Sequence, residues 1–342
     1  MTAARRWRAV LALFGAALVA GCQMDGSGLA VDAQVSIDAV DAVNADTDVA
    51  HAAVDAAAAT GDAACTVVPP LSHWATWPMP DSTAVAGAVT TPSYDLDTPG
   101  VVGDRITHLQ WQRAVDEASD TWYQAMNHCA CLTLGGQTDW RLPTRIELVS
   151  LVDVTRQSPS IDPTAFPDTP SEWFWTSSPA ADDSTAAWYV AFFDGDTHHQ
   201  DVTMPYRVRC VRTDATTVPD PRLTVFGDGI ASDNATGLTW QTASDPTLLT
   251  WEDAAAACAA LPAAAGSAAW RLPRAKELET LIDETRFDPA IDETIFPGTG
   301  SDSFWASSPL AGQAGFAWFV SFAAGVAYNS PTAEPHRVRC VH

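Results

Sequence analysis

One stretch of the sequence reads Trp140-Arg141-Leu142-Pro143-Thr144, and Glu147 follows it in a short run with apolar residues. It returns as Trp270-Arg271-Leu272-Pro273-Arg274, with Glu277 at the matching place. Proline fixes φ near the helical value and is well tolerated in the first turn of a helix. The apolar residues that follow lie about one helical turn apart, on one face. The stretch therefore predicts a helix entry in each copy, and we expect its arginine and glutamate to form an ion pair that holds the turn.

The repetition extends over most of the chain. Matched residues of the first copy include Trp111, Trp122, Cys129, Phe174, Trp175, Trp188, Arg209 and Cys210. Their counterparts in the second copy are Trp240, Trp251, Cys258, Phe304, Trp305, Trp318, Arg339 and Cys340. The residue numbers differ by 129 or 130 throughout. A repeat of this length indicates a domain duplication, and we expect each copy to fold around its own core.

The composition limits the classes of partner. The chain has 342 residues, which is enough for two domains of ordinary size. It carries 42 acidic residues against 18 lysines and arginines, and its formal net charge is −24. Binding to nucleic acid and other polyanions needs a basic surface that displaces counterions. The composition therefore excludes nucleic acid and disfavours sulfated polyanions, whereas cations and basic partners would be attracted.

The N-terminus has the pattern of an export signal. Three arginines precede an apolar run over residues 9–20, and Cys22 follows Ala-Gly directly. The run is shorter than the roughly 20 residues that a spanning helix needs. The cysteine resembles that of a bacterial lipobox, in which the thiol is acylated and becomes the new N-terminus. We therefore expect a signal peptide over residues 1–21 and lipidation at Cys22; Gln23 at the next position favours the outer membrane, on its periplasmic or its outer side.

Three further segments follow the signal. Residues 22–64 consist mainly of alanine, aspartate and valine without aromatic residues, which predicts a disordered tether. The first domain, with an N-terminal extension, occupies residues 65–213, and the second occupies residues 217–342. The boundary lies near residues 213–221, where threonine, aspartate and proline gather.

Each copy has the pattern of a compact α+β domain. In the second copy, a short strand is expected at residues 238–240, a helix over 251–261 with Thr250 as its N-cap, and a second helix after the Trp-Arg-Leu-Pro stretch. Short strands then follow at residues 304–306, 318–322 and 337–341. Two helices with several short antiparallel strands predict an α+β fold.

The cysteines predict disulfides. The chain has 7, and six remain when Cys22 is lipidated. An even number in an exported protein is typical of disulfide pairing. The duplication assigns the pairs as Cys129–Cys210, Cys258–Cys340 and, by exclusion, Cys65–Cys131, which would attach the extension to the first domain. Metal binding by Cys129 and Cys131 is disfavoured, because a gap of one residue does not match zinc-site spacing.

One polar stretch distinguishes the copies. It contains Asp194, Asp196, His198, His199 and Asp201, whereas residues 324–330 of the second copy contain no acid or histidine. Aspartate oxygens suit Ca²⁺ and imidazoles suit Zn²⁺, so a cation or another ligand would bind here first. The alternative is a solvated hairpin tip. The sequence predicts no metal and no cofactor, with Ca²⁺ at this loop as the one exception considered.

Other residues are assigned structural roles. Ser177-Ser178 and Ser307-Ser308 resemble a nucleophile motif only superficially, because no Gly-x-Ser-x-Gly elbow surrounds them. We interpret them as hydrogen-bonding turn residues. Arg209 and Arg339 are expected to form ion pairs near the last strand, as Arg141 and Arg271 do at the helix entry.

The combined motifs resemble a known family. A Gly-Leu-Thr-Trp-Gln strand, Trp-Arg-Leu-Pro before a helix, Phe-Trp-(Thr/Ala)-Ser-Ser and a closing Arg-Val-Arg-Cys-Val are similar to the bacterial domain typified by the C-terminal domain of the Legionella collagen-like adhesin. The resemblance covers residues 101–212 and 222–342. A more distant similarity to formylglycine-generating-enzyme-like domains implies a C-type-lectin-like fold for both tandem domains. The resemblance implies extracellular recognition rather than catalysis.

The sequence departs from these relatives in three respects. The adhesin binds sulfated polysaccharides, but the acidic charge of this chain does not suit that ligand. The calcium-binding triplets of sugar-binding C-type lectins are missing, and Glu334-Pro335-His336 matches the first of them only in part. The paired copper-binding cysteines of the formylglycine-generating enzyme are not evident either, because the cysteines here are assigned to disulfides, so we expect no enzyme activity.

The leading hypothesis is a lipid-anchored envelope protein that uses two lectin-like domains for recognition or adhesion, with a glycan or protein ligand outside the cell. One alternative is an enzyme derived from the formylglycine-generating type. Another is a purely structural envelope protein.

Overall fold

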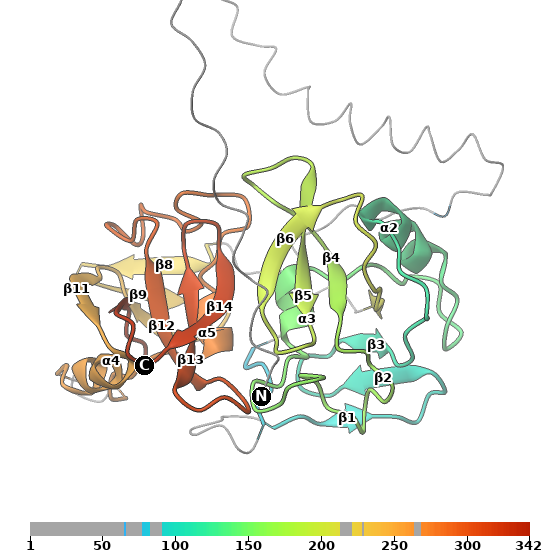
Figure 1. Cartoon of the computed structure of the whole chain (residues 1–342), viewed down its shortest axis with the longest axis horizontal. Helices are drawn as coiled ribbons and strands as arrows, with labels where there is room; N and C mark the ends of the chain where they lie inside the picture. Colours follow the sequence, from blue (N-terminus) through green and yellow to red (C-terminus); the bar gives the residue numbers. More distant parts are fainter. Residues whose placement is uncertain (1–64, 66–76, 83–90, 213–220, 228, 263–267) are drawn as a thin grey trace, which may run out of the picture. The chain divides into compact units, whose positions relative to one another are not determined.

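The computed structural model describes residues 65, 77–82, 91–212, 221–227, 229–262 and 268–342. The predicted signal peptide, Cys22, the tether and most of the predicted domain boundary lie outside these residues. None of the described helices is long and apolar enough to cross a membrane. The described residues belong to one compact unit (Figure 1).

Both copies are mixtures of short strands and short helices, as predicted. The elements of the first copy are β1 (Tyr94–Asp95), β2 (Val101–Asp104), β3 (Gln110–Gln112), α2 (Trp122–Cys131), α3 (Arg145–Val149), β4 (Trp173–Pro179), β5 (Ala186–Ala191), β6 (Thr197–Asp201) and β7 (Val211–Arg212). Those of the second copy are β8 (Leu223–Phe226), β9 (Ile230–Asp233), β10 (Thr239–Gln241), β11 (Asp245–Leu249), α4 (Trp251–Ala259), α5 (Ala275–Glu279), β12 (Ser303–Pro309), β13 (Phe316–Ser321), β14 (Val326–Pro331) and β15 (His336–Val338). More strands precede the first helix of each copy than the sequence predicted.

The Trp-Arg-Leu-Pro stretch enters a helix in both copies. In the first copy, the Thr144 hydroxyl accepts a hydrogen bond from the Glu147 amide, and the Glu147 carboxylate accepts one from the Thr144 amide, which is a capping box. The two terminal guanidinium nitrogens of Arg141 donate to the buried Glu147, at 2.8 and 2.7 Å. The predicted ion pair is thus present at the entry to α3.

The second copy repeats this arrangement with one difference. Arg271 donates to both oxygens of Glu277, at 2.6 and 2.7 Å. Arg274, which replaces the capping threonine, donates from its side chain to the same carboxylate at 2.7 Å. Burial favours the neutral acid, but the hydrogen bonds and charges of the two arginines together hold the pKa of Glu277 below its ordinary value.

Two small sheets flank a large one. The first copy has a four-stranded sheet in the order β1-β2-β3-β7, and the second has a three-stranded sheet in the order β10-β9-β8. The large sheet has eight strands, in the order β11-β15-β12-β13-β14-β6-β5-β4. Its first five strands come from the second copy and its last three from the first. The copies therefore share one sheet, which is continuous across the antiparallel pair β14 and β6.

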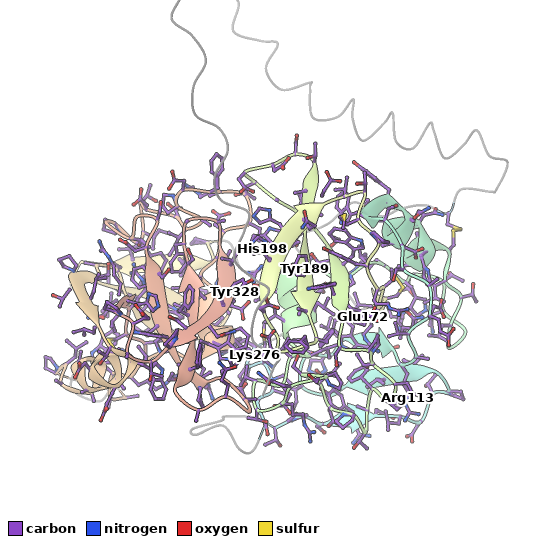
Figure 2. All side chains as sticks on the ribbon, in the orientation of Figure 1. Arg113, Glu172, Tyr189, His198, Lys276 and Tyr328 are labelled. Carbon is purple, nitrogen blue, oxygen red and sulfur yellow. A yellow bond between two sulfur atoms is a disulfide. The ribbon has the colours of Figure 1, made fainter. Side chains whose placement is uncertain are left out.

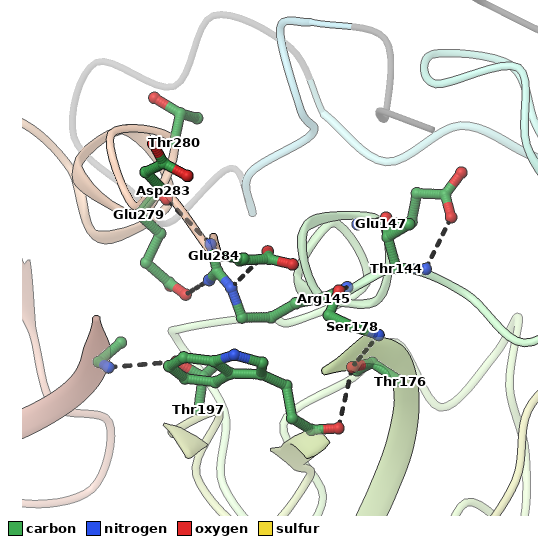
Figure 3. Close-up of polar contacts among 12 residues, drawn as sticks. Thr144, Arg145, Glu147, Thr176, Ser178, Thr197, Glu279, Thr280, Asp283 and Glu284 are labelled. Atoms are coloured by element: carbon green, nitrogen blue, oxygen red, sulfur yellow. Dashed lines mark hydrogen bonds and ion pairs between the residues drawn. The ribbon is translucent and has the colours of Figure 1, made fainter. Parts of the chain in front are cut away.

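The seam between β14 and β6 has pseudo-twofold symmetry. Ala327 pairs with Thr197, and these two residues occupy equivalent positions of the repeat. The Thr197 hydroxyl also accepts a hydrogen bond from the Ala327 amide at 3.1 Å (Figure 3). An antiparallel pair of equivalent residues is what a twofold axis through the seam requires.

Two tryptophans pack reciprocally across this seam. Trp188 of the first copy lies against Gly325 of the second, and the equivalent Trp318 lies against Gly195. An ideal Cβ on Gly325 would lie 2.6 Å from the Ile282 side chain and 3.6 Å from the Trp188 ring. Both glycines have positive φ, at +77° and +108°. Glycine is therefore required here for its backbone conformation and for the space that it leaves.

A buried ion pair also joins the copies. The Arg145 guanidinium donates to the Glu279 carboxylate at 3.0 Å and to Glu284 at 2.8 Å (Figure 3). It also lies over the Trp188 ring, 5.5 Å from the centroid. Burial raises the pKa of Glu279 to about 7, against the opposing charges of Arg145 and of Lys276.

Lys276 is buried at the same seam and bonds to backbone. Its ammonium donates to the Ser150 carbonyl of the first copy at 3.0 Å and to the Pro80 carbonyl at 2.8 Å. Burial lowers its pKa, and the nearby Asp81 opposes that shift. The N-terminal extension therefore contacts the second copy as well as the first.

The expectation that each copy folds on its own core is wrong. The largest apolar cluster contains Leu148 and Phe192 from the first copy together with Leu278 and Phe322 from the second. Smaller clusters around Cys129 and around Cys258 belong to single copies. The reason is the shared sheet, because both copies bury the same face of it.

The expectation for Arg209 and Arg339 is also wrong. Among the described residues, neither forms an ion pair, although both are fully buried. Arg209 donates to the carbonyls of Gln112 and Arg113 and to the Thr169 hydroxyl, and it lies 4.7 Å from the centre of the Phe166 ring. Arg339 has the equivalent partners. Burial lowers the pKa of each to about 9.

The three predicted disulfides are present. Cys129–Cys210 and Cys258–Cys340 close equivalent loops, with sequence separations of 81 and 82. Cys65–Cys131 attaches the extension to α2. In the chain-entropy model, a loop of about 80 residues closed by a disulfide stabilises the fold by roughly 4 kcal/mol.

The buried ion pair at the seam gives a first prediction. Arg145→Ala leaves Glu279 buried without its guanidinium, so we expect the free energy of unfolding to fall by about 3–5 kcal/mol. Arg156→Ala, which breaks a half-exposed pair with Asp153, should cost less than about 1 kcal/mol. Urea denaturation of the mature chain measures both. Arg145→Ala/Glu279→Val removes both charges and should be more stable than Arg145→Ala alone; equal losses for Arg145→Ala and Arg156→Ala would contradict the prediction.

The reciprocal packing gives a second prediction. Gly325→Ala places a methyl group against Ile282 and strains a backbone with φ of +77°. Gly315→Ala is the matched control, because its φ is +81° and nothing lies within 4 Å of an added Cβ. Both variants carry the backbone cost, so the difference between their free energies of unfolding reports the clash. We expect Gly325→Ala to be less stable than the control by about 1–3 kcal/mol, and equal stabilities would show that Gly325 is not packed against Ile282 as described.

Candidate functional site

The polar stretch that distinguishes the copies lies at the seam. Asp194, Gly195 and Asp196 lie in the turn after β5, and β6 begins at Thr197. The alternative of a solvated hairpin tip is wrong for this segment, because Thr197 is buried and pairs with Ala327 of the second copy. The stretch therefore lies where the two copies meet.

Three rings from both copies gather at this point. His198 stacks on Tyr189 with centroids 6.2 Å apart and an interplanar angle of 23°. It meets Tyr328 of the second copy edge-on, at 6.3 Å and 82°. Tyr189 and His198 are half-buried, and Tyr328 is 42% exposed. Figure 2 labels these three side chains, which lie near one another beside β6 and β14.

The rings continue into a longer row on the first copy. Tyr206 meets the Tyr189 ring at 5.2 Å, and Trp173 lies 5.6 Å from Tyr206. Trp173 is 50% exposed. We call Trp173, Tyr206, Tyr189, His198 and Tyr328 the aromatic row. It runs from β4 to β14, so one end belongs to each copy.

Helices cover the sheet on either side of this seam. Helix α2 packs on β4 around Trp175, and α4 packs on β12 and β15 around Trp305. Trp175 pairs in register with Tyr189, and Trp305 with Phe319, which is itself opposite Tyr328. The same face of the sheet is thus buried near its ends and carries partly exposed rings at the seam.

Two carboxyl groups lie next to the row. The Asp196 amide donates to the Asp194 carboxylate at 3.2 Å. Burial first, and then the charge and hydrogen bond of Asp194, raise the pKa of Asp196 to about 8, and Glu279 adds to the effect. Burial and, next, Asp196 raise the pKa of the Tyr189 and Tyr328 phenols. The two acids and the two phenols therefore share one electrostatic environment.

The remaining residues of the predicted site are His199 and Asp201. His199 stacks on His198 with ring centroids 4.9 Å apart, it meets the Trp188 ring at 5.4 Å and Asp182 at 3.5 Å, and burial lowers its pKa. Asp201 accepts hydrogen bonds from the amide and hydroxyl of Thr203, and the hydroxyl bond in particular lowers its pKa. The structure thus places the two acids Asp194 and Asp196 together in the turn and the two histidines together on β6, with Asp201 at the end of that strand.

No group of three or more histidine, cysteine, aspartate or glutamate side chains suited to a metal ion occurs in the described part of the chain. The candidate site consists of aromatic rings and a carboxyl pair.

The repeated serines serve the helix entry. The Ser178 hydroxyl accepts a hydrogen bond from the Arg145 amide at 3.0 Å, and Ser308 does the same for Ala275 at 3.1 Å. Both serines lie on strands, β4 and β12, rather than in turns. They satisfy backbone donors that the first turn of a helix leaves free.

Sequence reasoning missed the aromatic row, because only His198 of its residues lies in the polar stretch that distinguishes the copies. One signal was available. Tyr189, His198 and Tyr206 lie in or near short segments rich in polar or small residues. Tyr328 occupies the position of the second copy that is equivalent to His198. Their proximity, however, depends on the pairing of β6 with β14, which the repeat alone does not specify.

Comparison with known families identifies the repeat. The model of the Lcl C-terminal domain family matches residues 100–212 and again residues 229–342, which together exceed half of the chain. No curated protein matches the chain. The chain therefore belongs to the Lcl C-terminal domain family, of which it contains two copies.

Proposed function

We propose that this chain is a lipid-anchored protein of the bacterial outer membrane that recognises an extracellular ligand, either a glycan or a protein. This proposal rests on the aromatic row, in which partly exposed rings from both copies meet at one seam. Aromatic rings provide much of the contact energy in recognition surfaces and need little ordering, because each has only two rotatable side-chain bonds. The ligand would contact both copies at once.

Several features support recognition rather than catalysis. The repeated serines cap helices, and the arginine of each Trp-Arg-Leu-Pro stretch holds a buried glutamate. The motifs that the copies share thus maintain the fold. We further propose that each copy has a C-type-lectin-like fold. The short helices, the small sheets and the disulfide between the first helix and the end of each copy would fit that fold.

The N-terminal sequence supports the export and anchoring that we propose. The basic residues, the short apolar run and Cys22 support lipidation, and Gln23 supports the outer membrane. Three disulfides are in keeping with an oxidising compartment. The acidic residues 22–64 would then form a tether between lipid and domains.

The recognition function is tested with a ligand screen. The mature chain is applied to an array of extracellular glycans and matrix proteins, with and without Ca²⁺, and hits are compared with those of Tyr328→Ala. We expect that variant to weaken binding at least about fivefold, because it removes a ring that contributes about 1 kcal/mol or more. Tyr123→Ala is the matched control, since Tyr123 on α2 is 41% exposed and Tyr328 is 42% exposed. Equal binding by both variants, or no hit, would contradict the proposal.

Lipidation has its own test. Cys22→Ala should abolish fatty-acid labelling and move the protein from the membrane to the soluble fraction, because the acylated thiol is then missing. Globomycin should block processing of the unaltered chain. Mass spectrometry of the mature N-terminus checks the site, and an N-terminus other than acylated Cys22 would contradict the prediction.

A further inference from the structure

Partly exposed rings from both copies gather around His198 at the seam. Tyr189 and His198 are nearly parallel, whereas Tyr328 stands at 82° to His198. The face of an aromatic ring carries negative electrostatic potential and attracts ammonium and guanidinium groups. Tyr328, which is 42% exposed, is the ring here that a cation outside the fold reaches most easily.

The carboxyl pair beside these rings has no cationic partner in the described part of the chain. No lysine or arginine there forms an ion pair with Asp194 or Asp196, and no positive charge is among the main causes that shift the pKa of Asp196. Two buried acids elsewhere in the fold do have such partners: Glu147 has Arg141, and Asp233 has Arg222. At the seam the pKa of Asp196 is instead raised, so a cation from a partner would stabilise the second negative charge of the carboxyl pair.

The charge of the whole chain suits a basic partner. The formal net charge is −24, so the long-range field attracts cations and repels anions. A neutral sugar would stack on the rings, but its hydroxyls would not neutralise the acids. A positive charge contacts the rings and the carboxylates together, and thus uses both features of the site.

We propose that the aromatic row, with Asp194 and Asp196, binds guanidinium and ammonium groups of an arginine- or lysine-rich segment of a protein partner. This inference rests on the proposed recognition function and specifies the chemistry of its ligand. Tyr189, His198 and both acids come from the first copy and Tyr328 from the second, so the site is complete only when the copies are joined.

Proton release provides a specific signature of this site. In the free protein, burial and Asp194 raise the pKa of Asp196 to about 8, so the group is mostly protonated at pH 7. A bound cation favours the charged carboxylate and lowers this pKa. Binding at pH 7 should therefore release protons, and affinity should rise as the pH increases through 8. The other titratable groups that face this region are unchanged in variants that alter only Asp196. They are Glu279, Tyr189, Tyr328 and His198.

The experiment uses hexa-arginine peptide and the mature chain with Cys22→Ala, which keeps it soluble. Isothermal titration calorimetry in two buffers of different ionisation enthalpy gives the affinity and the protons released. We expect Asp196→Asn and Tyr328→Leu each to weaken binding by about tenfold, and Asp196→Asn to abolish most of the proton release. Glu252→Gln removes one exposed charge on α4, and Tyr123→Leu removes one exposed ring on α2, so both should change the affinity less than about twofold.

The controls separate this site from diffuse attraction. Equal weakening by Asp196→Asn and Glu252→Gln, with all variants folded by circular dichroism, would overturn the proposal. So would an absence of hexa-arginine binding at low ionic strength. A neutral oligosaccharide that needs Tyr328 but not Asp196 would overturn the cationic ligand and leave recognition at this seam standing. A failed array screen together with specific hexa-arginine binding would instead reject the ligand classes of the array.

Discussion

The fold depends on the reciprocal packing of two tryptophans against two glycines. Trp188 contacts the Gly325 position and Trp318 contacts the Gly195 position, and the space that each glycine leaves is filled by Ile282 or Val152 of the glycine's own copy. Each glycine also takes a backbone conformation that residues with a Cβ rarely adopt. These contacts bring β6 and β14 together, and that strand pair makes one sheet of two copies. Because both copies bury the same face of this sheet, the core forms only when the copies are joined.

The aromatic row is a consequence of the same constraint. Tyr189 and Tyr328 come from strands that are far apart in the sequence and reach the same face through the pairing of Thr197 with Ala327. The carboxyl pair at Asp194 and Asp196 lies in the turn that carries Gly195. A change that opens the seam would therefore disperse the candidate site, and stability and recognition are coupled at one place.

Local features could be predicted from the sequence, and the joining of the copies could not. The repeat itself indicates these local features, which are the helix entries, the Arg141–Glu147 ion pair and the disulfide partners. The burial of Arg209 without a carboxylate could not be predicted, because its acceptors are backbone carbonyls that any residue supplies. The shared sheet depends on how the edge strands of two domains meet. It could not be predicted, because the alternation of apolar and polar residues indicates a strand but not the strand that pairs with it.

The charges at the seam favour the pairing of a first copy with a second copy over the pairing of two like copies. Arg145, Lys276 and Glu279 are buried there, and the repeat places Ala275, Ile146 and Val149 at the equivalent positions. A symmetric pair of two first copies would bury Arg145 opposite Val149, without a carboxylate. Two second copies would bury Glu279 opposite Ala275. Each such arrangement leaves a charge unpaired in the interior, which costs several kcal/mol. The divergence of the copies at these positions therefore provides specificity against the wrong pairing, while the tryptophans and glycines that the copies still share provide the packing common to all of them.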